Sequence, residues 1–392
     1  MASGSQSNPS VSAFPLPYAR QTIDDDDIAA VAQALRCPLL TQGPGVVRFE
    51  RALADYLGAQ HVSACSSGTA ALHLAYLALG IGPGDEVVTT PITFSATAAA
   101  ALLAGASVRL ADVEPDSGLI DVARVERALS PATRAVVAVH LAGLPADLAP
   151  LRELCDRRGI WLVEDAAHAL GAEYRGRPVG SGLAHASTFS FHPVKHITTL
   201  EGGAVAVADD QLKARIDRLR EHGIERDPTR FERLAGEPWA YEVQDLGLNY
   251  RLSDVACALG LSQLGKQPAW LAHRRQLAAR YRARLADVPA ALPPVERPHR
   301  VSAHHLYPVR IDFRALGLGR ADAVRARAAR GIGTQVHYIP LFEQPLYRRH
   351  GAGERLEGAC HYHERTLSLP MHHSMSELDV DRVVGALAEV VS

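Results

Sequence analysis

Between Arg48 and about Ala208, helical stretches alternate with short runs rich in β-branched residues, and this alternation restricts the possible folds most strongly. Consecutive strands joined by helices usually lie parallel, because a parallel pair needs a long crossover connection. The sequence therefore predicts an α/β domain with a mixed, mostly parallel sheet. Its expected strands lie in EVVTTPIT, ASVRLADV, RAVVAVHL, IWLVEDAA, STFSFH and GGAVAVA.

The remainder of the chain predicts further helices and a second, smaller α+β domain. A Pro-rich stretch at 288–298 follows the helices and favours a domain change nearby. Beyond it, LYPVRIDF and GTQVHYI are strand-like. Helices are expected at 210–222, 253–264, 268–286, 321–330 and from Ser376. We divide the chain into a flexible, substrate-contacting lead (1–21), a large domain (22–265) and a small C-terminal domain (266–392).

Thr22 and the run Asp24–Asp27 precede the apolar sequence IAAVAQAL. Carboxylates in a first turn oppose the positive end of the helix dipole, so the run predicts a helix start. A metal-binding cluster is the alternative, but consecutive helix positions point in different directions.

The charge and the cysteine content limit which partners the protein can bind and in which cellular compartment we expect it. The 41 Lys and Arg against 43 Asp and Glu give a net charge of -2, which offers no broad positive surface for nucleic acid. The five cysteines are odd in number and form no C-x-x-C, so we expect neither disulfides nor a zinc site and place the protein in the cytoplasm. Neither an export signal nor an apolar run of about 20 residues is present, so we expect no membrane contact.

Familiar nucleotide and hydrolase motifs are absent from the sequence. It contains no G-x-x-x-x-G-K-[ST], no strand-linked G-x-G-x-x-G and no G-x-S-x-G. The chemistry must therefore come from other groups.

Two segments place polar groups where α/β enzymes place their sites, at strand ends. In SSGTAAL, Gly68 and Thr69 open a helix whose free N–H groups and hydroxyl suit a phosphate, although a simple helix cap explains the same residues. In WLVEDAAH, the carboxylate of Asp165 ends an apolar strand and can pair with a cationic ring nitrogen; capping the next turn is the alternative. His168 follows and could equally be a packing residue.

Two further segments add an amine and an amide. Lys195 comes directly after the β-run FSFHPV, where partial desolvation would lower the pKa of its amine and make it nucleophilic. Asn249 lies in GLNYRLSD, which by itself is only a helix entry.

Four segments, in their order and spacing, resemble the DegT/DnrJ/EryC1/StrS family of sugar aminotransferases: SSGTAAL, EDAAHALGA, FSFHPVK…TTLEGGAV and GLNYRLSD. The resemblance extends from about Tyr18 to the C-terminus. The resemblance implies the pyridoxal-phosphate (PLP) transferase fold type I, as in aspartate aminotransferase. It also implies a shared-site homodimer. A 3-dehydratase of the same fold is disfavoured because it has His where this chain has Lys195. A cofactor-bound regulator without turnover is a second alternative, disfavoured by the intact Lys195, Asp165 and Asn249.

The resemblance assigns roles residue by residue. Lys195 binds PLP covalently and moves the proton, and Asp165 pairs with the ring nitrogen. Asn249 reaches the phosphate of the neighbouring subunit. The remaining implied cofactor contacts are Gly68, Thr69, Ala70, Ser190, Phe94 and His168. L-Glutamate is the implied amino donor.

A finer resemblance points to the substrate. Pro17-Tyr18, PLLTQG and GTQVHYIP resemble the branch of the family that aminates C4 of UDP-2-acetamido-2,6-dideoxy-β-L-arabino-hex-4-ulose in pseudaminic acid biosynthesis. QVHYIP could also be only a core strand. One departure is His196, which we expect to change the mouth of the site. The implied sugar contacts are Tyr18, Pro38, Leu39, Leu40, Thr41, Gly68, Ser190, Asn249, Gln335, Val336, His337 and Tyr338.

Four histidines and one cysteine invite other roles. His361, His363, His372 and His373 suggest a metal, but such spacings rarely converge, so we expect packing or surface roles and no metal. Cys65 beside the phosphate loop could be a redox thiol, and we expect instead a small buried apolar residue.

Overall fold

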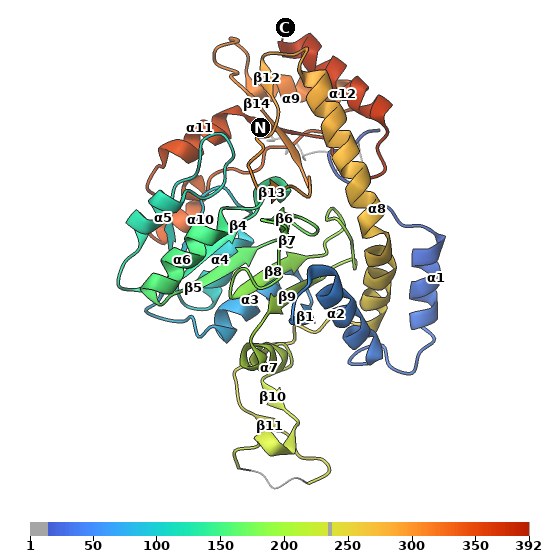
Figure 1. Ribbon diagram of the computed structural model, residues 1–392, viewed down its shortest axis with the longest axis vertical. Helices are drawn as coiled ribbons and strands as arrows, with labels where there is room; N and C mark the ends of the chain where they lie inside the picture. Colours follow the sequence, from blue (N-terminus) through green and yellow to red (C-terminus); the bar gives the residue numbers. More distant parts are fainter. Residues whose placement is uncertain (1–14, 234–236, 392) are drawn as a thin grey trace, which may run out of the picture.

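The computed structural model describes residues 15–233 and 237–391, so residues 1–14 of the expected lead lie outside the described part. Its centre is a seven-stranded sheet in the order β1-β9-β8-β5-β4-β2-β3 (Figure 1). All neighbours are parallel except β9, which is antiparallel to β1 and β8. The strands are β1 His61–Cys65, β2 Glu86–Thr89, β3 Ser107–Leu110, β4 Thr133–Val139, β5 Trp161–Asp165, β8 Ala186–Ser190 and β9 Gly203–Val207.

The mixed, mostly parallel sheet is as predicted, and each of the six apolar runs holds a strand. Strand β1 was not predicted. Helices cover both faces (Figure 1), because alternate strand residues enter different cores: Val205 and Val207 pack in one, and Ala204 and Ala206 in the other. The surrounding helices are α2 Pro44–Leu57, α3 Gly68–Ala78, α4 Ala96–Leu103, α5 Val122–Ala128, α6 Leu148–Arg158 and α7 Asp210–Leu219.

Helix α8, Asp254–Leu285, is one continuous helix of 32 residues, where two helices were expected. Pro268 lies inside it and costs roughly 3 kcal/mol in a helix interior. Burial of Leu264 and Leu271 on either side offsets that cost. The helix starts against α1 and α2 and ends against α12 (Figure 1). The domain division proposed at residues 265 and 266 thus falls inside a helix.

The C-terminal part packs a three-stranded antiparallel sheet against helices, as an α+β unit does. The predicted strand GTQVHYI is wrong: residues 333–339 form no strand beyond a bridge from Gln335 to Ser368. The consecutive residues His337 and Tyr338 face the same cavity, which the alternation of a regular strand does not allow. The elements are β12 Ala291–Leu292, β14 Tyr307–Ile311, β15 Thr366–Leu369, α9 Arg320–Ala329, α10 Pro345–Arg349, α11 Glu357–Arg365 and α12 Glu377–Val391.

Smaller elements complete the structure. Helix α1, Asp25–Ala34, starts in a capping box between Asp24 and Asp27, which confirms the predicted helix start. Strands β10 Ile224–Glu225 and β11 Glu242–Val243 form a hairpin that projects from the body (Figure 1). Another three-stranded sheet joins β6 Glu173–Tyr174, β7 Arg177–Pro178 and β13 Arg300–Val301. None of the helices in the described ranges could cross a membrane.

Candidate active site

A cavity of about 880 Å³ opens at the carboxyl ends of β4, β5 and β8, beside the start of α3. Parallel sheets typically bind ligands at this edge. The segment 335–339 of the C-terminal unit forms the opposite wall. Twelve predicted site residues line this one cavity: Tyr18, Gly68, Thr69, Phe94, Asp165, His168, Ser190, Lys195, Gln335, Val336, His337 and Tyr338.

Lys195 lies in the cavity wall, just beyond β8. Its amine makes no hydrogen bond and no ion pair among the residues described here. The side chain is half-buried in the cavity wall, and this burial lowers the pKa of the amine to about 8, although the charge of Asp165 opposes the shift. A substantial fraction of the amine is therefore neutral and nucleophilic near neutral pH.

Asp165 ends strand β5 and is 6% exposed. Its carboxylate accepts hydrogen bonds from the Thr97 hydroxyl at 2.6 Å and from the Ala167 N–H at 3.2 Å. These two donors fix the carboxylate toward the cavity that Lys195 also faces. The bond from the Ala167 N–H is a turn bond, so the capping alternative holds for Asp165, and its pairing with a ring nitrogen stays a prediction.

The start of α3 has the shape of a phosphate cradle. The nearest atom to a Cβ added at Gly68 would be the Cβ of Ser190, at 2.8 Å, so only glycine leaves this space open. Thr69 and Ser190 bring hydroxyl groups to the same place. The helix-cap alternative also holds: the Ser67 hydroxyl accepts from the Ala70 N–H at 3.0 Å. Ala70 does not line the cavity, and its role stays a prediction.

His168 lies in the cavity wall between Asp165 and the segment 335–339. Its Nε2 is 3.2 Å from the Tyr338 hydroxyl, and its ring packs on His305 with centroids 4.3 Å apart. Burial, together with the charge of Lys195, holds the pKa of His168 well below its usual value. The ring is neutral at pH 7 and can serve as a hydrogen-bonding wall.

The opposite wall is built from aromatic and imidazole rings. The ring of Tyr18 lies 5.6 Å from that of His337, and Nδ1 of His337 is 2.8 Å from the Ser368 hydroxyl. Burial lowers the pKa of His337 to about 3, so it is uncharged. Phe94 is 61% exposed and its ring lies 6.2 Å from that of Tyr338, at the cavity edge.

Two predicted groups lie outside this cavity: Asn249 and the segment 38–41. Both are exposed and close to each other at the start of α8. The Leu40 carbonyl accepts from the Asp254 N–H at 2.9 Å, Thr41 bridges Ser253, and Asn249 bridges Glu221. Within one chain, these groups do not line the cavity that Lys195 faces.

The expectation for His196 is wrong. It is 1% exposed, does not line the cavity and bonds the Ala303 carbonyl at 3.1 Å, because its ring points into the protein behind Lys195. Within the described ranges, no cluster of three His, Cys, Asp or Glu side chains could hold a metal. Cys65 is buried, which raises the pKa of its thiol to about 12.

Some site residues were missed by sequence reasoning. Thr97, at the start of α4, lies behind the cavity wall and acts through its hydrogen bond to Asp165, a contact between segments 68 positions apart. Two other residues, His305 and Tyr347, line the cavity and come from segments that are far away in the sequence and carry no motif. The Tyr347 hydroxyl donates a hydrogen bond to the Ser95 carbonyl at 2.7 Å.

Comparisons with known proteins agree with this geometry. The sequence model of the DegT/DnrJ/EryC1/StrS aminotransferase family matches residues 21–388. The spore coat polysaccharide biosynthesis protein SpsC of Bacillus subtilis (strain 168) is 36% identical over 379 residues, 96% of this chain and 97% of SpsC. Helicobacter pylori PseC, an aminotransferase of pseudaminic acid biosynthesis, is 32% identical with a TM-score of 0.88, covering 96% of this chain and 99% of PseC.

DesI, solved in the presence of its TDP-sugar product, is 33% identical with a TM-score of 0.85, covering 97% of this chain and 94% of DesI. Enzymes of this family depend on PLP, and solved relatives include forms that carry it. The free amine of Lys195, the carboxylate of Asp165 and the glycine cradle fit that cofactor, and fold type I is confirmed. The chain therefore belongs to the DegT/DnrJ/EryC1/StrS aminotransferase family and is a PLP-dependent sugar aminotransferase.

Proposed function

We propose that this enzyme transfers the amino group of L-glutamate to C4 of UDP-2-acetamido-2,6-dideoxy-β-L-arabino-hex-4-ulose, giving UDP-4-amino-4,6-dideoxy-N-acetyl-β-L-altrosamine for pseudaminic acid biosynthesis. The observation that carries the proposal is the single cavity in which Lys195 and Asp165 face the polar segment 335–338. The TDP-sugar product of DesI and the pathway of PseC support a nucleotide-sugar substrate of this kind.

Bound PLP supplies the electron-withdrawing ring that allows an amino group to leave the donor and join the keto-sugar. Lys195 lies free in the cavity to hold the cofactor and to move the proton between the donor's Cα and the cofactor. Asp165, fixed by Thr97, would keep a proton on the ring nitrogen. Thr69 and Ser190 would hold the phosphate at the start of α3, where the helix dipole favours an anion.

His337, Tyr338 and Tyr18 form the wall that meets the sugar. A buried, hydrogen-bonded imidazole such as His337 is well suited to discriminate sugar epimers, because a wrong epimer leaves buried polar groups unpaired. The expected preference is for the β-L-arabino 4-keto sugar over its D-xylo epimer.

The assay compares both epimers with glutamate as donor and identifies the products by NMR. His337→Ala should raise the KM for the sugar and leave the half-reaction with glutamate nearly intact, whereas the exposed His350→Ala serves as a control and should change neither. Faster turnover of the D-xylo sugar would refute the specific substrate and favour another nucleotide-linked keto-sugar. An absent spectral response to any donor would favour a catalytically silent regulator.

We also propose a homodimer in which each copy completes the cavity of the other. The surface formed by residues 38–41 and Asn249 carries predicted ligand contacts yet is exposed and does not line the cavity of its own chain. Leu39 and Leu40 on this surface are 54% and 43% exposed, and such apolar exposure favours burial against another chain. All five cysteines are free, which supports the proposed cytoplasmic location.

A further inference from the structure

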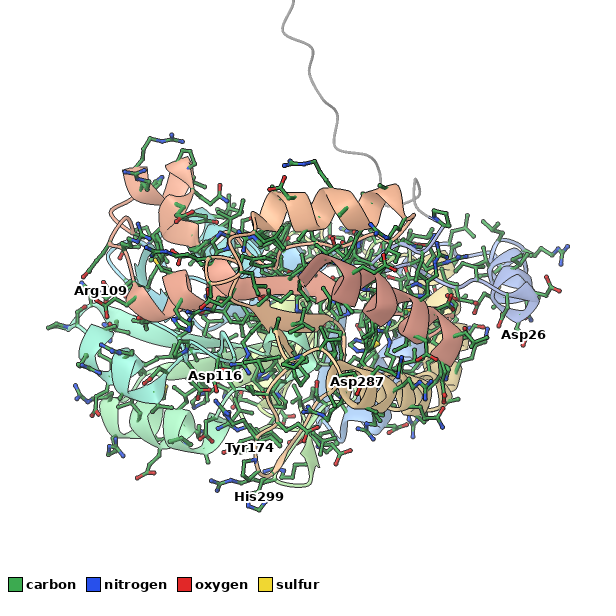
Figure 2. All side chains as sticks on the ribbon, turned by 90° about the horizontal axis from the view of Figure 1, so that it is seen from above. Asp26, Arg109, Asp116, Tyr174, Asp287 and His299 are labelled. Atoms are coloured by element: carbon green, nitrogen blue, oxygen red, sulfur yellow. The ribbon has the colours of Figure 1, made fainter. Side chains whose placement is uncertain are left out.

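Arg274 is a buried arginine in the second half of α8, where two packed cores meet. Leu271, one turn before it, packs in the core around α2 and β9, and Leu277, one turn after it, packs in the core of the C-terminal unit. Figure 2 shows Asp287, just after α8, well away from Asp26 in α1, against which the helix starts. The Arg274 side chain is 1% exposed, so it lies inside the junction and not on its surface.

The guanidinium group of Arg274 is held by backbone carbonyls alone. Its Nη1 lies 3.2 Å from the carbonyl oxygen of His304, 3.5 Å from that of His305 and 3.0 Å from that of Met371. It forms no ion pair with a carboxylate in the part of the chain that the structure describes. Burial lowers the pKa of the group to about 10, so it stays charged at neutral pH. Filling this space does not require a charge, because an apolar side chain of similar volume often serves a core equally well. What an apolar side chain cannot do is hold two separate segments by their carbonyls.

The first of these segments carries part of the active-site cavity. His305 lines the cavity, and its ring packs on that of His168 with centroids 4.3 Å apart. His168 in turn lies 3.2 Å from the Tyr338 hydroxyl through its Nε2. A shift of residues 304 and 305 would therefore pass through two imidazole rings to Tyr338.

The second segment supports the other members of the same wall. The Met371 N–H donates to the Tyr18 carbonyl at 2.9 Å, and Tyr18 lines the cavity. Three residues earlier, the Ser368 hydroxyl lies 2.8 Å from Nδ1 of His337. Tyr18 and His337 are thus both bonded to the segment whose end Arg274 holds.

We propose that Arg274 is a positioning residue: by holding these two segments together, it sets the wall that meets the sugar without contacting the sugar itself. Arg274 does not line the cavity, and its three hydrogen bonds do not involve the segments that carry Lys195 and Asp165. Its loss should therefore weaken sugar binding and spare the half-reaction with the donor. This inference rests on the proposed sugar-binding role of the wall.

The test compares R274M and R274K in the PLP-loaded enzyme. Methionine keeps an unbranched side chain but has no donor, whereas the ammonium group of lysine can still donate to carbonyls. R327K is the matched control. Arg327 is also a buried arginine of the C-terminal unit, 0% exposed, and burial lowers its pKa to about 10 as well. It does not line the cavity, and its guanidinium group donates to the Ala323 carbonyl of its own helix.

R274M should raise the KM for the keto-sugar at least roughly tenfold, as expected when hydrogen bonds from a charged group are lost, and leave the glutamate half-reaction within a few-fold of wild type. R274K should recover part of this loss, and R327K should change neither value. Melting temperatures check that each variant is folded. An equal rise in KM in R327K, or an equal loss of both half-reactions in R274M, would reduce Arg274 to a structural role and overturn the proposal.

Hydrogen exchange adds a measurement that does not depend on the substrate. The amides of Ser368 and Met371 donate to the carbonyls of Gln335 and Tyr18 at 2.8 and 2.9 Å. Both amides should exchange faster in R274M than in wild type and R327K, because the segment loses its hold. Unchanged exchange in R274M would overturn the positioning role, and faster exchange with an unchanged KM would overturn its effect on the sugar.

Failure of the proposed function looks different from failure of this inference. If the wall does not meet the sugar, His337→Ala also leaves the KM unchanged, whereas the exchange of the two amides still responds to R274M. If R274M does not fold, R274K decides alone: a wild-type KM together with wild-type exchange in that variant would overturn the proposal.

Discussion

The pKa of Lys195 can be measured through the return of the cofactor to the cofactor-free enzyme. The neutral amine is the nucleophile, so the rate of covalent PLP binding should rise with pH and level off above about 8. At pH 7 roughly one amine in ten is neutral with this pKa, against roughly one in three thousand for an ordinary lysine, a difference of about 300-fold in rate.

The measurement is stopped-flow absorbance of bound PLP between pH 7 and 10.5, with Lys195→Ala as the blank. The charge of Asp165 opposes the lowering of the lysine pKa, so Asp165→Asn should move the midpoint to lower pH. A midpoint near 10.5, the ordinary lysine value, would refute the reasoning from burial. An upward shift in Asp165→Asn would show that the two groups do not interact as described.

Three further predictions concern turnover. Lys195→Ala should abolish it, because no other lysine lines the cavity; retained activity, or retained absorbance of covalently bound PLP, would contradict the assignment. Asp165→Asn should still bind PLP but lose on the order of 4 kcal/mol of transition-state stabilisation, about a thousandfold in kcat, since a neutral amide does not hold the ring cation; a rate within a few-fold of wild type would place that role elsewhere. Mixed Lys195→Ala and Asn249→Ala subunits should regain activity, because one site of each heterodimer contains both intact residues; no recovery after confirmed subunit exchange would place Asn249 in its own chain's site.

The sequence predicted what depends on local pattern. The strands ending at Asp165 and at Ser190 were found because buried parallel strands are continuous apolar runs. The residues at their ends meet in one cavity because parallel strands end at one edge of the sheet.

Features that depend on tertiary packing were not predictable in this way. In the sequence, Pro268 predicts a helix break. In the structure, α8 is continuous because Leu264 and Leu271 on either side of Pro268 pack in the core. Residues 335–338 alternate like a strand, yet the cavity takes both His337 and Tyr338. The Thr97 hydroxyl reaches Asp165 across 68 positions of sequence, a contact that no local pattern records.

The continuity of α8 also restricts how such enzymes can be recombined. Each residue added to or removed from a helix turns everything beyond it by about 100° and shifts it by about 1.5 Å. A chimaera that exchanges the C-terminal unit, which forms one wall of the cavity, between relatives at residue 266 must therefore preserve helical phase through Pro268, whereas an insertion in the hairpin of β10 and β11 changes no such phase. We therefore expect a substrate preference to be transferred only when the whole C-terminal unit is exchanged and the helical phase of α8 is kept.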